Sequence, residues 1–187
     1  MNKTNQELYY ERTPVLETER LILRPLTPDD AETAFIWHSD PRVNKFMSYP
    51  LYTDISQTVR WITEIVPVEE DIHWGIVLKE SNKVVGMIAV FDIQNARMGD
   101  IGYRIHPEYW NMGITTEALK EVVRFIFENT EIERLNGRAD VRNVASNKVM
   151  EKCGFIKEGT IRQGKMVSVY CDYNIYGMLR EDYAKIN

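Results

Sequence analysis

The stretch GYRIHPEYWNMGITTEAL, residues 102–119, decides how the chain is interpreted, because it passes from a strand through a turn into a helix. The strand is predicted to end at His106, and an amphipathic helix is predicted from Ile114 to Asn129. Between them lies Asn111-Met112-Gly113, with no Ser/Thr-x-x-Glu capping box in register. The sequence therefore raises the question of what satisfies the amide groups at this helix start.

A helix start leaves four backbone N–H groups without partners and carries a partial positive charge. Gly113 has no Cβ, so its backbone can approach a ligand closely or take a positive φ. This arrangement suits an anion such as a pyrophosphate, held by main-chain amides. The alternative is a plain turn whose amides bond to water or to Asn111, or a later start capped by Thr115 or Thr116. Neither Gly-x-x-x-x-Gly-Lys nor Gly-x-Gly-x-x-Gly occurs, so nucleotide hydrolysis and dinucleotide binding have no direct support.

The elements around this stretch predict the fold class. Before it, a strand over 20–26 leads to a helix from Thr27 to about Ser39, and Asp54 opens a second helix that Pro67 ends. The order predicts one α+β domain of three layers (an α/β arrangement), with a mostly antiparallel sheet and one strand–helix–strand crossover after residue 100. The other predicted elements are strands over 73–80, 83–93, 100–106, 134–141, 155–162 and 168–179, and a helix over 145–153 stopped by Gly154.

Composition narrows the classes of function. The chain has 187 residues, of which 44% are hydrophobic, enough for one well-buried core. Its net charge of −5 argues against nucleic acid as the main partner. No segment resembles a signal peptide or a membrane span, and we expect a cytoplasmic protein in which Cys153 and Cys171 are reduced. His38, His73 and His106 are scattered without the spacing of metal ligands, so no metal is expected.

Three stretches together resemble one family. GYRIHPEYWNMGITTEAL resembles the acyl-CoA-binding segment of the GNAT N-acetyltransferases. NVASNKVMEKCGFIKEG, residues 143–159, resembles the Asn-x-x-Ser helix and Gly-Phe strand start that follow it, and RLILRPLTPDDAE, residues 20–32, resembles the opening strand and helix. The likeness spans roughly residues 18–182 and is closest to the branch that acetylates the N-terminal alanine of ribosomal proteins.

The resemblance implies a single GNAT domain over residues 1–187, whose central, mixed but mostly antiparallel sheet is splayed open and flanked by helices. Acetyl-CoA would lie in the gap, with its pyrophosphate on the amides of residues 111–116. The end of the 100–106 strand would bind the pantetheine and offer an N–H to the thioester oxygen. The implied cofactor-binding residues are Tyr103, Arg104, Ile105, Trp110, Asn111, Met112, Gly113, Ile114, Thr115, Thr116, Asn143 and Ser146.

The sequence departs from the family pattern on the thiol side. Many relatives carry a tyrosine as general acid where this chain has Met150, which cannot donate a proton. Ser146 is the predicted replacement; the alternative is a helix-start serine that bonds its own backbone. Asn143 is predicted to contact the pantetheine amide or else to cap the short helix. Trp110 and Thr115 also differ from the Gln or Arg and the Gly or Ala that the broader superfamily often has there.

A base is also needed, because the attacking amine must lose a proton. Asp100, in the strand that leads to the acyl site, is the first candidate, and Asp172 and Glu108 are reserves. The alternative for Asp100 is a strand-end aspartate bonded to a loop amide. An N-terminal amine with a pKa of about 7.7–8.0 is partly neutral already, so a modest base suffices.

We therefore expect transfer of an acetyl group from acetyl-CoA to the N-terminal α-amine of a protein, by a monomer or homodimer that binds neither nucleic acid nor membranes. A small amine (polyamine, amino acid or antibiotic) is the alternative acceptor, and a non-catalytic acyl-CoA-binding module is a further possibility. A Cys171–histidine nucleophile is disfavoured against a buried strand thiol. The following aromatic residues either line an acceptor groove or belong to the core: Trp37, Tyr49, Trp61 and Trp74.

Overall fold

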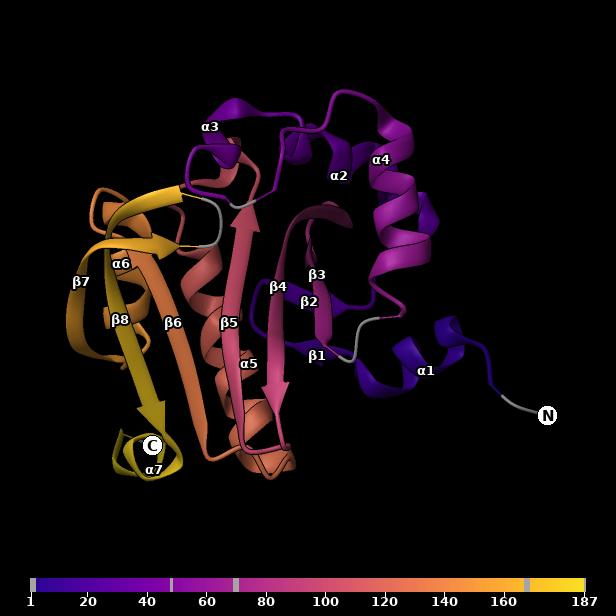
Figure 1. Cartoon of the computed structure of the whole chain (residues 1–187). Coiled ribbons are helices and arrows are strands. Elements are labelled where there is room, and N and C mark those ends of the chain that lie inside the picture. Colours follow the sequence, from indigo (N-terminus) through magenta and orange to yellow (C-terminus); the bar gives the residue numbers. More distant parts are fainter. Residues whose placement is uncertain (1–2, 48, 69–70, 167–168, 187) are drawn as a thin grey trace.

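A single sheet organises the computed structural model, which describes residues 3–47, 49–68, 71–166 and 169–186 (Figure 1). Its order is β1-β2-β3-β4-β5-β6-β8-β7. All neighbours are antiparallel except β5 and β6, which the α5 crossover makes parallel, as predicted. The strands are β1 Leu16–Glu17, β2 Leu21–Arg24, β3 Ile72–Leu78, β4 Lys83–Gln94, β5 Met98–Ile105, β6 Arg134–Asp140, β7 Ile156–Met166 and β8 Val169–Leu179. Ser168, where the last strand was predicted to begin, lies outside the described residues.

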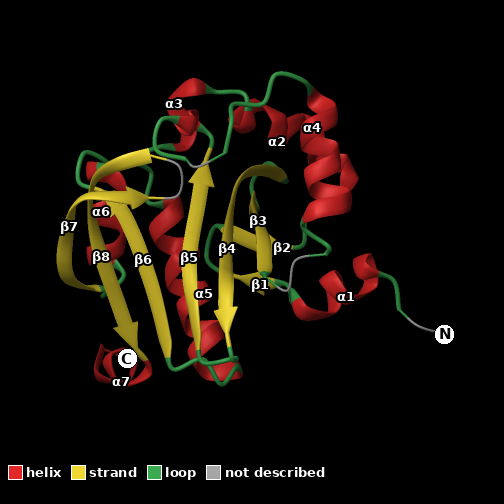
Figure 2. Cartoon of the chain, in the orientation of Figure 1, coloured by secondary structure: helices red, strands yellow, loops and turns green. Residues whose placement is uncertain are grey.

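Helices lie on both sides of the sheet and make three layers (Figure 2). The α-helices are α1 Asn5–Arg12, α2 Ala31–His38, α3 Pro41–Asn44, α4 Ile55–Arg60, α5 Ile114–Asn129, α6 Val144–Lys152 and α7 Arg180–Ile186. Short 3₁₀ turns span Pro28–Asp30 and Pro107–Tyr109, and a π turn over Trp61–Ile65 continues α4. The three-layer prediction is confirmed.

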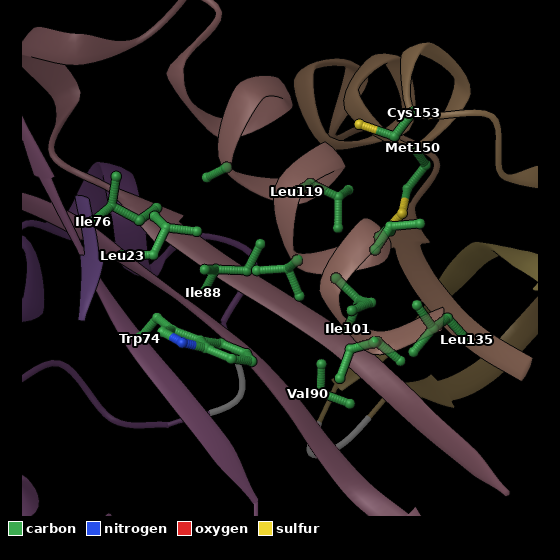
Figure 3. Packing of buried hydrophobic residues seen from close by; sticks show 14 of the residues in the cluster. Leu23, Trp74, Ile76, Ile88, Val90, Ile101, Leu119, Leu135, Met150 and Cys153 are labelled. Atoms are coloured by element: carbon green, nitrogen blue, oxygen red, sulfur yellow. The ribbon is translucent and has the colours of Figure 1, made fainter. Parts of the chain in front are cut away.

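Strand β4 shows why the layers form, because it is buried on both faces. Successive side chains of a strand point to opposite faces. Ile88 and Val90 join a core cluster with Leu119 of α5 (Figure 3). Met87 joins a second cluster with Trp37 of α2. Trp37, Trp61 and Trp74 are all buried, so of the two predicted alternatives the core is confirmed for these three.

The sequence analysis missed four elements: α1, β1, α3 and α7. Helix α1 has little amphipathic pattern, since Tyr9 is its one buried side chain among those described. Its capping box, in which Thr4 and Glu7 bond reciprocally, was the readable signal. The predicted box at α4 is confirmed: Asp54 accepts from the Ser56 N–H at 2.8 Å, and Gln57 accepts from the Asp54 N–H at 3.1 Å.

The sheet opens between β5 and β6 (Figure 1). The two strands pair only from Met98↔Arg134 to Asp100↔Asn136, and no further pairing joins them within the described residues. From residue 101 onward the β6-facing edge of β5 is therefore left without a strand partner.

Candidate active site

Two neighbouring cavities occupy the opening. The larger, of about 680 Å³, is walled by the start of α5, by α6 and by the segment after α3. The smaller, of about 220 Å³, is walled by β5, β6 and β8. Tyr103, Asn143 and Ser146 line both. The cavities therefore meet at the end of β5 and the start of α6.

The start of α5 is uncapped. Gly113 is the N-cap residue in the left-handed region, at φ 77°, and no side chain of the described residues caps the first amides. Asn111 also has a positive φ, 61°, but it does not cap the helix. Thr115 and Thr116 lie inside the helix and do not cap it. The predicted alternatives of a cap by Asn111, Thr115 or Thr116 are therefore wrong, and the helix start lines the larger cavity.

A polar clamp fixes this helix start to the edge of β2. Glu117, in the first turn, accepts from Thr18 Oγ1 at 2.6 Å and from Arg20 Nε at 2.7 Å. Arg20 Nη1 also donates to the carbonyl of Met112 at 3.1 Å. Burial would raise the pKa of Glu117, but the hydrogen bonds from Thr18 and Arg20 outweigh it and hold that pKa below its ordinary value. Sequence reasoning gave Arg20 no role, although it opens the RLILRPL motif.

The end of β5 turns some of its backbone groups toward the opening. The N–H of His106 donates to Val85 of β4 at 2.7 Å. Because backbone groups alternate in an antiparallel pair, those of Ile105 and Tyr103 point to the opposite, unpaired edge. The backbone of Arg104 points toward β4, so this residue reaches a ligand only through its side chain.

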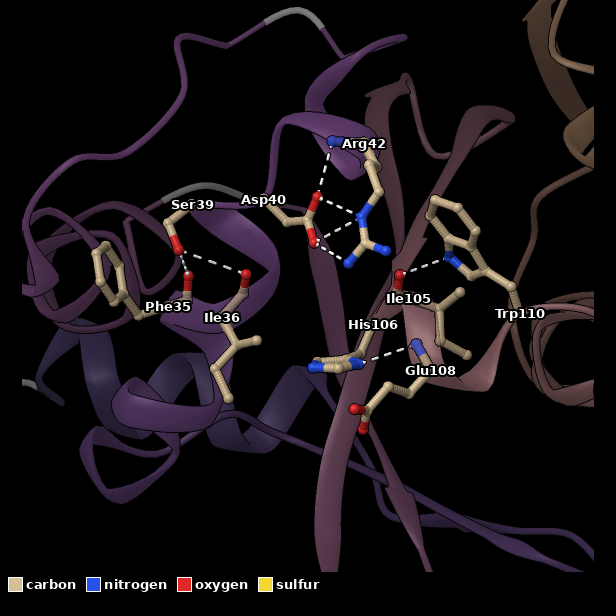
Figure 4. A network of polar contacts seen from close by, with 9 residues as sticks. All are labelled: Phe35, Ile36, Ser39, Asp40, Arg42, Ile105, His106, Glu108 and Trp110. Carbon is tan, nitrogen blue, oxygen red and sulfur yellow. Dashed lines mark hydrogen bonds and ion pairs between the residues drawn. The ribbon is translucent and has the colours of Figure 1, made fainter.

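The turn after β5 is held by further polar contacts (Figure 4). The indole N–H of Trp110 donates to the carbonyl of Ile105 at 3.0 Å. Asp40 accepts from the Arg42 N–H at 2.8 Å and pairs with its guanidinium at 2.6 Å. Glu108 donates its N–H to the ring of His106 at 3.1 Å, and its side chain is exposed. Trp110 and Arg42 thus stand in the wall of the larger cavity.

Ser146 meets a tyrosine hydroxyl. The Oη of Tyr103 lies 2.9 Å from Ser146 Oγ. Asn143 Oδ1 accepts from the Ser146 N–H at 3.2 Å, which confirms its predicted capping alternative. Burial raises the pKa of Tyr103, so the hydroxyl is protonated at neutral pH. Sequence reasoning missed this pair, because it considered only the backbone of Tyr103.

Asp100 stands where the pairing of β5 and β6 ends, and it lines the smaller cavity. Its carboxylate accepts from Asn136 Nδ2 and from Arg138 Nη2, each at 3.0 Å. The alternative of a bond to a loop amide is therefore wrong, since both partners are β6 side chains. Asp172 accepts from the Gln163 N–H at 2.8 Å. Neither Asp172 nor Glu108 is among the described residues that line the two cavities.

Other side chains of the walls set the charge of the site. Lys148 and Lys152 of α6 line the same cavity as the open helix start. Arg142 pairs with Asp140 at 2.6 Å. Cys171 lines the smaller cavity, but burial raises its pKa and disfavours the thiolate.

The described residues offer neither a metal site nor a membrane-spanning helix. No cluster of three or more His, Cys, Asp or Glu side chains suited to a metal ion was found among them. None of the described helices is long and apolar enough to span a membrane.

Comparison with known proteins identifies the family. The family description "Acetyltransferase (GNAT) domain" matches residues 20–156, well over half of the chain. The chain belongs to the GNAT acetyltransferases. The similar proteins include the "Uncharacterized N-acetyltransferase YoaA" of Bacillus subtilis (strain 168), 32% identical over 89% of this chain and 97% of that protein. YdaF of the same organism, named provisionally as a ribosomal N-acetyltransferase, is 28% identical over 88% of this chain and 94% of its own length.

Solved structures agree with this assignment. A GNAT-family acetyltransferase from Bacillus anthracis superposes with a TM-score of 0.83 at 24% identity, over 90% of this chain and 99% of that one. The predicted GNAT fold is confirmed, and the protein is an acetyl-transferring enzyme. Members of this family use acetyl-CoA, and the open α5 start and β5 edge fit it.

Proposed function

We propose that this GNAT enzyme moves the acetyl group of acetyl-CoA directly to the N-terminal α-amine of a protein, of the ribosomal-protein-alanine type. The observation that carries the proposal is the uncapped start of α5 beside the unpaired edge of β5, in the wall of one cavity. Free amides at a helix start suit a diphosphate. An unpaired strand edge suits an extended arm that carries amide groups of its own.

Each part of acetyl-CoA then has its own partners. The amides of residues 111–116 hold the diphosphate, and Lys148 and Lys152 add positive charge beside it. The backbone groups of Tyr103 and the N–H of Ile105, whose carbonyl already accepts from Trp110, hold the pantetheine arm and orient the thioester carbonyl toward a backbone N–H. The side-chain oxygen of Asn143 caps α6. Its side-chain N–H groups are therefore left to donate to the pantetheine arm.

Two groups handle the protons. As the bond from nitrogen to the acetyl carbon forms and the carbon–sulfur bond breaks, the amine must lose a proton and the thiolate must gain one. Asp100 takes the amine proton through water, because a carboxylate has about four acceptor sites and Asn136 and Arg138 use one on each oxygen. Ser146 relays a proton from water to the thiolate, and Tyr103, which stays protonated, orients the serine hydroxyl through their 2.9 Å contact.

The acceptor class rests on two supports. YdaF carries a name that refers to ribosomal N-acetylation. An α-amine with a pKa of about 7.7–8.0 is partly neutral at physiological pH, whereas a lysine amine near 10.4 needs a stronger base. A single carboxylate already bonded to Arg138 is a modest base, which fits the α-amine better.

The test is release of free CoA thiol from acetyl-CoA by the purified chain with a peptide that begins with a free alanine. We expect steady release, none with the same peptide already acetylated at its N-terminus, and slower release with a peptide whose only free amine is a lysine side chain. Asp100→Asn and Ser146→Ala should each lower kcat about a hundredfold. Release only with polyamines, amino acids or antibiotics would move the enzyme to small acceptors. Acetyl-CoA binding without release to any amine would indicate a non-catalytic module.

A further inference from the structure

Arg104 of β5 is held between two aromatic rings. Its Cζ atom lies 4.7 Å from the ring centroid of Tyr49 and 4.7 Å from that of Trp61. A guanidinium stacked in this way is attracted by both ring faces, while the edges that carry its N–H groups stay free. The two rings therefore fix the position of the Arg104 side chain, and its N–H groups remain available as hydrogen-bond donors.

The charge of Arg104 has no anionic partner among the described residues. Its Nε is buried and makes no hydrogen bond there. Other arginines of the cavity walls differ: Arg42 pairs with Asp40, Arg138 with Asp100 and Arg142 with Asp140. A half-buried cation without a counter-ion is costly, and a hydrogen-bonding anion would remove that cost.

Among the described residues, the rings around Arg104 carry no charge. His38 is fully buried beside Tyr49, Tyr52 and Trp61. Burial, followed by the charge of Arg104, lowers the pKa of His38 to about 2, so its ring is neutral. The unpaired cation thus lines the larger cavity against an uncharged aromatic wall.

The position of Arg104 relates it to the acceptor. Asp100, Gly102 and Arg104 alternate along one face of β5, while Tyr103 faces Ser146 on the other. The proposed base and the unpaired cation are thus four residues apart, about 13 Å between Cα atoms at the rise of a strand. An acceptor with an amine at one end and an anion near it fits this order of charges.

We propose that Arg104 binds an anionic group of the acceptor, a carboxylate close to the reacting amine. This inference rests on the proposed function and names the class of acceptor. A side-chain carboxylate in the first residues of a protein and the free α-carboxylate of a small amine share this chemistry. A planar guanidinium recognises either by paired hydrogen bonds.

The experiment measures CoA release with matched acceptors. One pair is two peptides that begin Ala-Asp and Ala-Asn and are otherwise identical, and the other is alanine and alaninamide. For the wild-type chain we expect the acidic member of one pair to be favoured, and the pair that shows the preference tells the source of the carboxylate. Arg104→Gln should lower kcat/KM for the acidic member roughly ten- to a hundredfold and leave the amide member within about twofold.

Controls separate this role from packing and from cosubstrate binding. Arg162→Gln removes the same charge from an exposed site on β7 and should change nothing. Arg104→Lys keeps the charge and should retain part of the preference. Equal use of the acid and the amide by the wild type would overturn the proposal, as would an equal loss for both in Arg104→Gln, or a raised KM for acetyl-CoA instead.

A binding measurement distinguishes this proposal from the proposed function. The affinity of the two peptides, measured by calorimetry in the presence of CoA, reports the anion site without turnover. If no amine releases CoA but the Ala-Asp peptide still binds more tightly than Ala-Asn, and Arg104→Gln abolishes the difference, the anion site stands and the proposed function fails. If binding shows no preference either, both fail.

Discussion

The starts of α4 and α5 are opposite solutions to the same physical problem. At α4 Asp54 and Gln57 satisfy the orphan amides reciprocally. At α5 a glycine in the left-handed region replaces the capping side chain. The chain therefore has the means to close a helix start and leaves this one open, which makes α5 the end suited to an external anion.

The first turn of α5 strengthens the contrast. Glu117 is the acidic residue in the first turn of α5, and a carboxylate there would compete with a bound anion. Thr18 and Arg20 bind that carboxylate from the β1–β2 side, so its charge is neutralised away from the helix end. The open start of α5 thus depends on Thr18 and Arg20, because they bind the Glu117 carboxylate that would otherwise compete with a bound anion.

Among the substitutions that test this difference between α4 and α5, Gly113→Val should have the largest effect on acetyl-CoA binding. A residue with a Cβ costs about 1–2 kcal/mol in the left-handed region, and a β-branched one costs more. The turn should shift to relieve this strain and misalign the amides, so we expect the Kd for acetyl-CoA, measured by calorimetry, to rise at least tenfold. Gly159→Ala on β7, where the nearest atom lies 3.8 Å from the added Cβ, is the matched control and should bind normally. Normal binding by Gly113→Val would mean that these amides do not hold the cosubstrate.

Replacing Arg20 tests whether the clamp serves the helix start. Arg20→Ala removes the guanidinium bonds to Glu117 and to the Met112 carbonyl and leaves the carboxylate beside the amides without its counter-charge, although the bonds from Thr18 and from the backbone N–H of residue 20 remain. The KM for acetyl-CoA should rise about tenfold, the equivalent of about 1.4 kcal/mol. The rate with acetyl-pantetheine, which has no diphosphate, should stay the same. An equal loss with both donors would point to general damage, and Glu117→Gln in the Arg20→Ala background should restore much of the affinity.

How far the sequence predicted these features depends on the reach of each contact. The strand–turn–helix at 102–119 and the Asp54 box are local, and both were predicted from neighbouring residues. The pairs Tyr103–Ser146 and Arg20–Glu117 join positions 43 and 97 residues apart, and no local pattern brings them together. The opening between β5 and β6 was expected from resemblance alone, because strand periodicity reports burial and not where pairing stops.

The smallest expected effect comes from comparing two caps that the chain does use. Asp54→Ala and Asn143→Ala each remove one side-chain bond to a helix amide, and each should lower the free energy of unfolding by about 1 kcal/mol in denaturant titration. Only Asn143→Ala should also lower kcat for CoA release, by a few-fold, because its cap positions the Ser146 hydroxyl against Tyr103. If both variants lost stability and neither lost activity, the start of α6 would act as α4 does, as a closed helix end without a part in the reaction, and the proton route through Ser146 would be wrong.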